Sequence, residues 1–197
     1  MKINVNNNIK SFTKDLQKFK KVDVPNITRI AINETAKEVQ KFTKLSMKKS
    51  FDRPRPTTIN SVFIIFAKKT NFTAVITFRD WAQEFIHRNI QGGVRSVKNT
   101  AVPTINAKLN KYGNIPNRRG GVGNKQNQFR AVINGRYGVW EKNKKTGKLT
   151  IIHRFETNPV YSAIFPFYRI AKKTANTFID KKFIKVADYY IRKAGYK

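Results

Sequence analysis

The spacing of apolar residues predicts a long helix over about residues 26–50. Within it, small and apolar side chains recur with the 3.6-residue period of a helix that buries one face. This face is expected to carry Ile32, Ala36, Val39, Phe42 or Thr43, and Ser46. Asn26 or Thr28 is expected to cap the start of the helix, since a side-chain oxygen there accepts a free backbone N–H. Pro54 and Pro56 are expected to end it, because proline cannot continue a helix.

A second long helix is predicted over about residues 164–194, with Pro166 in its first turn. Its apolar side chains follow one another at intervals of three or four residues. The expected buried face comprises Ala171, Ala175, Ile179, Phe183, Val186 and Tyr190. The opposite face is expected to be exposed and to carry Lys172, Lys173, Lys181, Lys182 and Lys185. The pattern therefore predicts an amphipathic helix with a basic outer side.

Between these helices, alternation of apolar and polar residues predicts a β-hairpin. Its strands cover about residues 58–67 and 71–79, and its turn lies at 68–71. The longest apolar run of the chain, residues 62–67, fits a buried strand. We therefore expect a hairpin with one well-covered strand.

Three more strands are predicted at about residues 129–134, 137–142 and 149–155. Asn134-Gly135 and Thr146-Gly147 supply turn signals between them, because asparagine and glycine tolerate the backbone angles of tight hairpins. Phe129 and Trp140 are expected to lie in the core of this part.

The middle of the chain is irregular: a short helix is predicted at about 81–90, ended by Gly92-Gly93, and an extended loop at 106–128. Residues 1–24 are polar and lysine-rich and are expected to form a basic arm before a single domain, residues 25–197. The order of elements predicts an α+β fold. Its mostly antiparallel sheet of about five strands would be flanked by an N-terminal helix and a long C-terminal helix, with a long basic central loop.

The chain is strongly basic: it has 41 Lys and Arg against 11 Asp and Glu, a formal net charge of +30. Such a charge destabilises a free compact protein by self-repulsion, so a negatively charged partner is expected. Aromatic residues make up 12% of the chain, which is enough to build a core and excludes a disordered basic tail. No apolar run approaches the roughly 20 residues of a membrane span, and the N-terminal sequence lacks the apolar core of a signal peptide.

Residues with catalytic chemistry are sparse. The absence of cysteine excludes disulfides, thiolate zinc sites and cysteine nucleophiles. His87 and His153 lack the spacing of metal ligands. One catalytic alternative is a metal-dependent nuclease site made of Asp80, Glu84, Glu141 and His87. We expect no catalytic, cofactor-binding or metal-binding residues, and hence no enzyme.

A basic segment is the strongest candidate for binding. Residues 106–154 hold twelve Lys or Arg and one acid, Glu141. Candidate contacts to DNA or to an acidic partner are Lys108, Lys111, Arg118, Arg119, Lys125 and Arg130. These residues leave two alternatives open: non-specific binding to a phosphate backbone, or a basic face that simply contacts solvent.

Several motifs follow one another along the chain. Residues 31–36 read Ala-Ile-Asn-Glu-Thr-Ala, 91–93 read Gln-Gly-Gly, 112–116 read Tyr-Gly-Asn-Ile-Pro, and 137–141 read Tyr-Gly-Val-Trp-Glu. In this order they resemble motifs of the minor tail protein Z family of tailed phages and of related tail-completion and neck proteins. The motif residues are Asn33, Gly92, Gly93, Tyr112, Gly113, Asn114, Pro116, Phe129, Gly138 and Trp140.

The resemblance covers about residues 27–194 and implies a non-enzymatic structural protein of the virion, in its tail or neck region, made in the host cytoplasm. Such proteins form rings at the head–tail junction or complete the tail, and they stabilise the connection through which DNA passes. The resemblance implies a homo-oligomeric ring, six- or twelve-fold, next to portal, adaptor, tail-tube or neck proteins, with DNA in the channel as a further candidate contact. No cofactor and no membrane contact are expected.

Overall fold

The computed structural model describes residue 17 and residues 19–116 and 127–193, and these fall into two compact units. Unit 1 contains the described chain up to Ser46, Asn60–Asp80 and the segment from Pro166 onward. Unit 2 contains Met47–Ile59 and Trp81–Phe165. The single domain expected over residues 25–197 stays a prediction. Most of the predicted arm, residues 1–24, lies outside the described residues.

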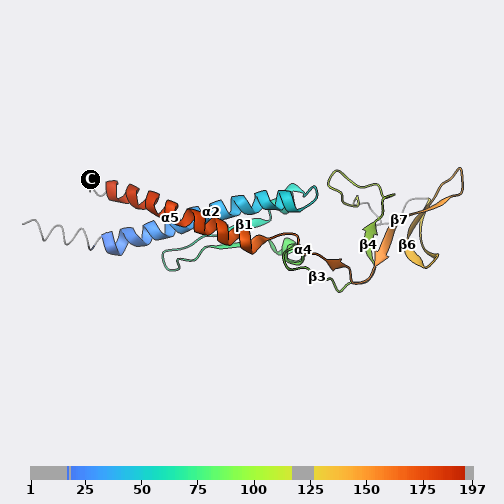
Figure 1. Cartoon of the computed structure of the whole chain (residues 1–197), viewed down its shortest axis with the longest axis horizontal. Helices are drawn as coiled ribbons and strands as arrows, with labels where there is room; N and C mark the ends of the chain where they lie inside the picture. Colours follow the sequence, from blue (N-terminus) through green and yellow to red (C-terminus); the bar gives the residue numbers. More distant parts are fainter. Residues whose placement is uncertain (1–16, 18, 117–126, 194–197) are drawn as a thin grey trace, which may run out of the picture. The chain divides into compact units, whose positions relative to one another are not determined.

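Unit 1 is built on two long helices that lie side by side, α2 (Val24–Ser50) and α5 (Phe167–Lys193) (Figure 1). A π-helical turn, η1 (Phe19–Asp23), precedes α2. The predicted position of the cap is wrong, because the helix begins ahead of Asn26 and Thr28. Pro25 fits the first turn of a helix, where its missing N–H is not needed.

All but one of the buried side chains of α2 recur at every fourth residue: Ile27, Ala31, Thr35, Val39, Thr43 and Met47. The predicted face is confirmed at Ala36, Val39 and Thr43, which are all buried. Phe42 remains partly exposed, with its ring 5.8 Å from that of Phe178 on α5. Thr35 is buried, and its hydroxyl is hydrogen-bonded, since Oγ1 donates to the carbonyl of Ala31 at 2.8 Å.

Polar side chains of α2 hold the neighbouring hairpin. The side chain of Asn33 makes two hydrogen bonds with Ala67: Nδ2 donates to its carbonyl at 3.2 Å, and Oδ1 accepts from its N–H at 2.7 Å. Gln40, two turns further on, donates to the carbonyl of Val62 at 2.9 Å. Asn33 and Gln40 lie on one helix face, and they fix both ends of the segment 62–67.

The hairpin is shorter than the sequence predicts. It pairs β1 (Val62–Ile65) with β2 (Val75–Phe78) in antiparallel register, and Lys68 and Asn71 form the expected turn. Residues 56–59 form a short helix, α3 (Pro56–Ile59), rather than a strand, because Pro56 fits a helix start. The expectation of a fully buried run is also wrong, since Ile65 is 52% exposed and Phe66 is exposed as well.

Helix α5 differs from the predicted amphipathic pattern in two places. Phe183, expected in the core, is exposed. Lys182, expected in solvent, donates from Nζ to Oε1 of Glu38 on α2 at 2.9 Å, and both side chains are largely covered. The hydrogen bond from Lys182 lowers the pKa of Glu38 below its ordinary value. An ion pair therefore joins the two helices at a position where the sequence indicates only a solvated lysine.

Unit 2 contains a four-stranded antiparallel sheet in the order β4-β7-β6-β5. Its strands are β4 (Thr100–Pro103), β5 (Gln128–Ile133), β6 (Arg136–Lys142) and β7 (Leu149–Glu156). The unit also holds helix α4 (Asp80–Gln91) and the two-stranded pair β3 (Gly93–Val94) with β8 (Val160–Tyr161). The predicted strands β5, β6 and β7 are confirmed, and the sequence missed β3, β4 and β8.

The core of the four-stranded sheet lies on its central strands. Trp140 is buried as predicted, and its indole N–H donates to the carbonyl of Ala131 at 3.2 Å. The prediction for Phe129 is wrong: its ring is 38% exposed, because β5 is an edge strand of this sheet. The α+β class is confirmed, with eight strands in three antiparallel sheets over the described residues. No helix among the described residues is long and apolar enough to cross a membrane.

We expect Asn33→Ala to lower the free energy of unfolding by about 1–3 kcal/mol, because it leaves the Ala67 peptide without its partners. Lys37→Ala is the matched control on the exposed side of α2, and it should change stability by less than about 0.5 kcal/mol. Denaturant unfolding measures both. Equal costs for the two variants would contradict the assigned role of Asn33.

Gly138→Ala should cost about 3 kcal/mol, since an added Cβ would lie 2.3 Å from the carbonyl oxygen of His153. Gly135→Ala is the control: its Cβ would meet no atom within 4 Å, and only its φ of +70° is unfavourable. This control should cost about 1 kcal/mol. Thermal unfolding distinguishes the two, and a smaller loss for Gly138→Ala than for Gly135→Ala would refute the close approach of β6 and β7.

Acid should destabilise unit 2 through His153, whose ring is buried on β7 without a hydrogen-bond partner on either nitrogen in the described structure. Burial lowers the pKa of His153 below its ordinary value. The unfolded chain therefore binds more protons as the pH falls through about 6.5, and stability drops by up to about 1.4 kcal/mol per pH unit.

This pH dependence is measured by denaturant unfolding between about pH 7.5 and about pH 5.5, above the window in which carboxylates titrate. His153→Phe should flatten the slope, whereas His87→Gln, at an exposed position, should keep it. An unchanged slope in His153→Phe would show that another group is responsible.

Candidate interaction site

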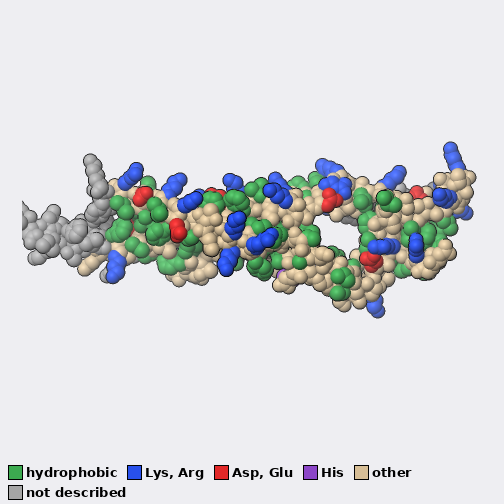
Figure 2. Space-filling view, in the orientation of Figure 1, with side chains coloured by type: hydrophobic (Ala, Val, Ile, Leu, Met, Phe, Trp, Pro, Cys, Tyr) green, Lys and Arg blue, Asp and Glu red, His purple; other side chains and the backbone are tan. Residues whose placement is uncertain are grey.

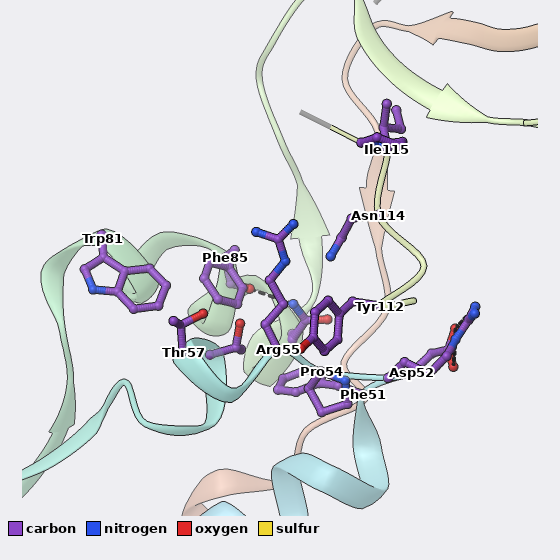
Figure 3. A pocket seen from close by; sticks show the side chains of 14 residues that line it. Phe51, Asp52, Pro54, Arg55, Thr57, Trp81, Phe85, Tyr112, Asn114 and Ile115 are labelled. Carbon is purple, nitrogen blue, oxygen red and sulfur yellow. Dashed lines mark hydrogen bonds and ion pairs between the residues drawn. The ribbon is translucent and has the colours of Figure 1, made fainter. Parts of the chain in front are cut away.

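Unit 2 contains a cleft of about 680 Å³, lined by three segments that are far apart in the sequence. The first is the chain that follows α2, the second is one face of α4, and the third is the turn around Tyr112 (Figure 3). The lining combines four aromatic rings and two prolines with arginine, threonine and asparagine side chains.

The first wall is formed where helix α2 ends. Arg53 takes a left-handed φ of +44°, and the following prolines direct the chain into α3. Nη2 of Arg53 lies 2.9 Å from Oδ2 of Asp52, and this hydrogen bond lowers the pKa of Asp52. Asp52, the acid in the cleft lining, is thereby held in an ion pair with Arg53. The guanidinium of Arg55 has no carboxylate partner within the described ranges, and it points up between Phe85 and Asn114 (Figure 3).

The second wall is the exposed face of α4. Trp81 and Phe85 are one helical turn apart, so their side chains share a face, with ring centroids separated by 6.3 Å. Trp81 is 57% exposed, which is unusual for so large an apolar side chain. The other side of the helix is anchored by Ala82 and Ile86, which are fully buried.

The third wall is a closed turn built by Asn110. Its Oδ1 accepts from the N–H of Tyr112 at 2.9 Å and from that of Asn114 at 3.1 Å. Gly113 has a φ of +73°, and a Cβ there would lie 3.0 Å from a nitrogen of Arg53, so glycine is the residue that fits. The turn thus presents the Tyr112 ring to the cleft.

Two cations lie over the ring of Tyr112. Cζ of Arg55 is 5.8 Å and Nζ of Lys111 is 5.1 Å from the ring centroid, within the range of cation–π attraction. The ring therefore attracts one cation from the first wall and one from its own turn.

Three of the six basic residues predicted as contacts lie among the described residues, and the prediction of a shared contact surface stays a prediction. Lys111 lies over the ring of Tyr112 beside the cleft, and Lys108 is exposed in the same segment. Arg130 lies on the edge strand β5, with its guanidinium 5.6 Å from the ring centroid of Phe155. Arg118, Arg119 and Lys125 fall outside the described residues.

The motif residues have separate structural positions. Tyr112, Asn114 and Pro116 line the cleft, and Gly113 shapes it. Gly92 and Gly93 have positive φ angles directly after α4, which ends there as expected. Asn33 holds the hairpin of unit 1, and Gly138 and Trp140 form the sheet core of unit 2.

The carboxylates of the nuclease alternative have individual partners. Glu84 pairs with Arg88 and lies 3.8 Å from Arg95. Glu141 accepts hydrogen bonds from the side chains of Asn127 and Gln128. Within the described part of the chain, no three His, Cys, Asp or Glu side chains gather as a metal site requires.

Sequence reasoning missed Arg55, Trp81 and Phe85. Their signal was weak but present: two aromatic residues four apart in an otherwise polar helix indicate an aromatic face that the core does not use. Arg55 carried no signal beyond its place between two prolines.

Two cross-strand apolar pairs are also exposed. In unit 1, Ile65 faces Val75 in the hairpin register, and both are exposed. In unit 2, Val94 faces Val160, which are 59% and 79% exposed. In Figure 2, Lys and Arg side chains are spread over the visible face of the described residues, and Asp and Glu side chains are fewer.

No family model, no curated protein and no solved structure matches this chain.

Proposed function

We propose that this chain is a non-enzymatic structural protein of a tailed-phage virion, forming part of a ring at the head–tail junction or neck, or completing the tail. The ordered motifs that resemble the minor tail protein Z family support this proposal. Their residues occupy positions with clear structural reasons: Asn33 holds a hairpin, Gly138 permits two strands to approach, and Gly113 shapes a turn.

The observation that carries the proposal is the set of exposed apolar surfaces on a highly basic chain. Neighbouring apolar side chains exposed on paired strands are typical of surfaces that are covered in an assembly. The pairs Ile65 with Val75 and Val94 with Val160 have this character, one in each unit. A ring subunit needs such surfaces, because each copy contacts its neighbours.

The charge of +30 then determines what the remaining surface contacts. Five of the acids are held in ion pairs by cations of this same chain, which leaves few carboxylates against the many Lys and Arg that identical copies bring to one another. Acidic faces of portal, adaptor, tail-tube or neck proteins, or the DNA of the channel, supply the counter-charge.

The test is the location of the chain in purified phage particles. We expect mass spectrometry of particles to detect it, and electron microscopy to place it in the neck or tail as a six- or twelve-fold ring. Because screening weakens contacts between charges, high salt should loosen its attachment. Absence of the chain from purified particles would overturn the proposal.

Non-specific binding to a phosphate backbone is the second candidate. It is favoured by Lys108 and Lys111, which lie in one exposed segment. Under this alternative, affinity for DNA falls steeply with salt, with a slope set by the number of phosphates neutralised. Lack of any DNA affinity at about 0.1 M salt would exclude it.

A further inference from the structure

We propose that the cleft of unit 2 is the docking site for an acidic, extended segment of a partner protein. The inference rests on the proposed function, since it specifies how this chain would attach to a neighbour in the virion. The site consists of Arg55, Trp81, Phe85 and Tyr112.

The charge of the cleft calls for a carboxylate. Arg55 lies among rings without an acid partner in the described structure, while Asp52 is held by Arg53. A guanidinium binds a carboxylate through two parallel hydrogen bonds, and nearby rings strengthen the pair by excluding water. The occupant is therefore negatively charged where it meets Arg55.

A second copy of this chain does not supply that charge. Its 11 acids are scattered along 197 residues without an acidic run. The pairs closest together, Glu34 with Glu38 and Asp80 with Glu84, lie on helices beside basic residues. No stretch of this chain therefore matches an acidic extended segment, so the segment belongs to a different protein.

The lining favours a peptide over a nucleic acid. A single strand carries a phosphate at every nucleotide and needs a row of cations. The cleft is lined by two arginines, and one of them, Arg53, is paired with Asp52. Arg55 and Lys111 both lie over the Tyr112 ring, which is thereby unavailable for stacking. Duplex DNA would leave Trp81 and Phe85 uncovered, because it is too wide to enter.

The composition is that of an interaction hot spot. Tryptophan, tyrosine and arginine in one pocket are the residues that dominate protein–protein binding energy. An apolar side chain of the segment would cover Trp81 and Phe85, and its carboxylate would pair with Arg55. The side chains of Thr57 and Asn114, which also line the cleft, offer hydrogen bonds to its peptide groups.

The chain contains a built-in reporter, because it has two tryptophans and Trp140 is buried. In a Trp140→Phe background, fluorescence reports on Trp81 alone. The probe is a synthetic peptide of about 12 residues in which glutamate alternates with leucine and phenylalanine, which reaches roughly 40 Å when extended. We expect a saturable blue shift as the peptide covers the indole.

Arg55→Gln should weaken binding of this peptide at least about tenfold, the effect of losing a charge-assisted pair. Lys148→Gln is the matched control, since it removes one charge from an exposed turn of the same unit and should change affinity less than about twofold. A peptide with lysine in place of glutamate should not bind. Anisotropy of fluorescein-labelled peptide with the wild-type chain gives the same readout without the Trp140 substitution.

Absence of saturable binding in both assays would overturn the inference, as would equal weakening by Arg55→Gln and Lys148→Gln. Tighter binding of a twelve-nucleotide oligo-dT than of the acidic peptide would assign the cleft to nucleic acid instead. These outcomes are separate from the particle test: a chain present in virions whose cleft binds no acidic peptide keeps the proposed function and loses this inference.

Discussion

The hydrogen bonds between the side chain of Asn33 and the peptide of Ala67 are the constraint on which unit 1 depends. A two-stranded hairpin is only marginally stable by itself, so β1 and β2 need a surface that fixes their register and position. Helix α2 provides it with Asn33 and Gln40 on one face. Helix α2 is held in turn by α5, through the ion pair between Glu38 and Lys182.

Unit 2 depends on a different constraint, the enforced end of α2. Pro54 and Pro56 stop the helix and place Arg55 between α4 and the turn around Tyr112. The glycine at 113 lets that turn approach Arg53 closely. The positive charge of the cleft thus comes from Arg55, for which the described structure shows no carboxylate partner.

Acids are scarce in this chain, and this scarcity supports the proposed role in an assembly with acidic partners. Half of the acids in the described structure form ion pairs within the chain, such as Glu38 with Lys182 and Asp52 with Arg53. The positive excess is therefore available to partners of opposite charge. Exposed apolar pairs on both units have the same implication, because a surface that is basic and apolar together fits an acidic protein face better than it fits water.

The sequence by itself determined the long helices, the hairpin and the strands β5, β6 and β7, because each has a strong local period or a tight-turn signal. It also determined the net charge. Only the tertiary structure decided that Phe129 is exposed and that Lys182 is paired, since both depend on which element covers them. The tertiary structure also decided the cleft. Arg55, Trp81 and Tyr112 are separated by dozens of residues, and no local sequence pattern predicts that folding brings them together.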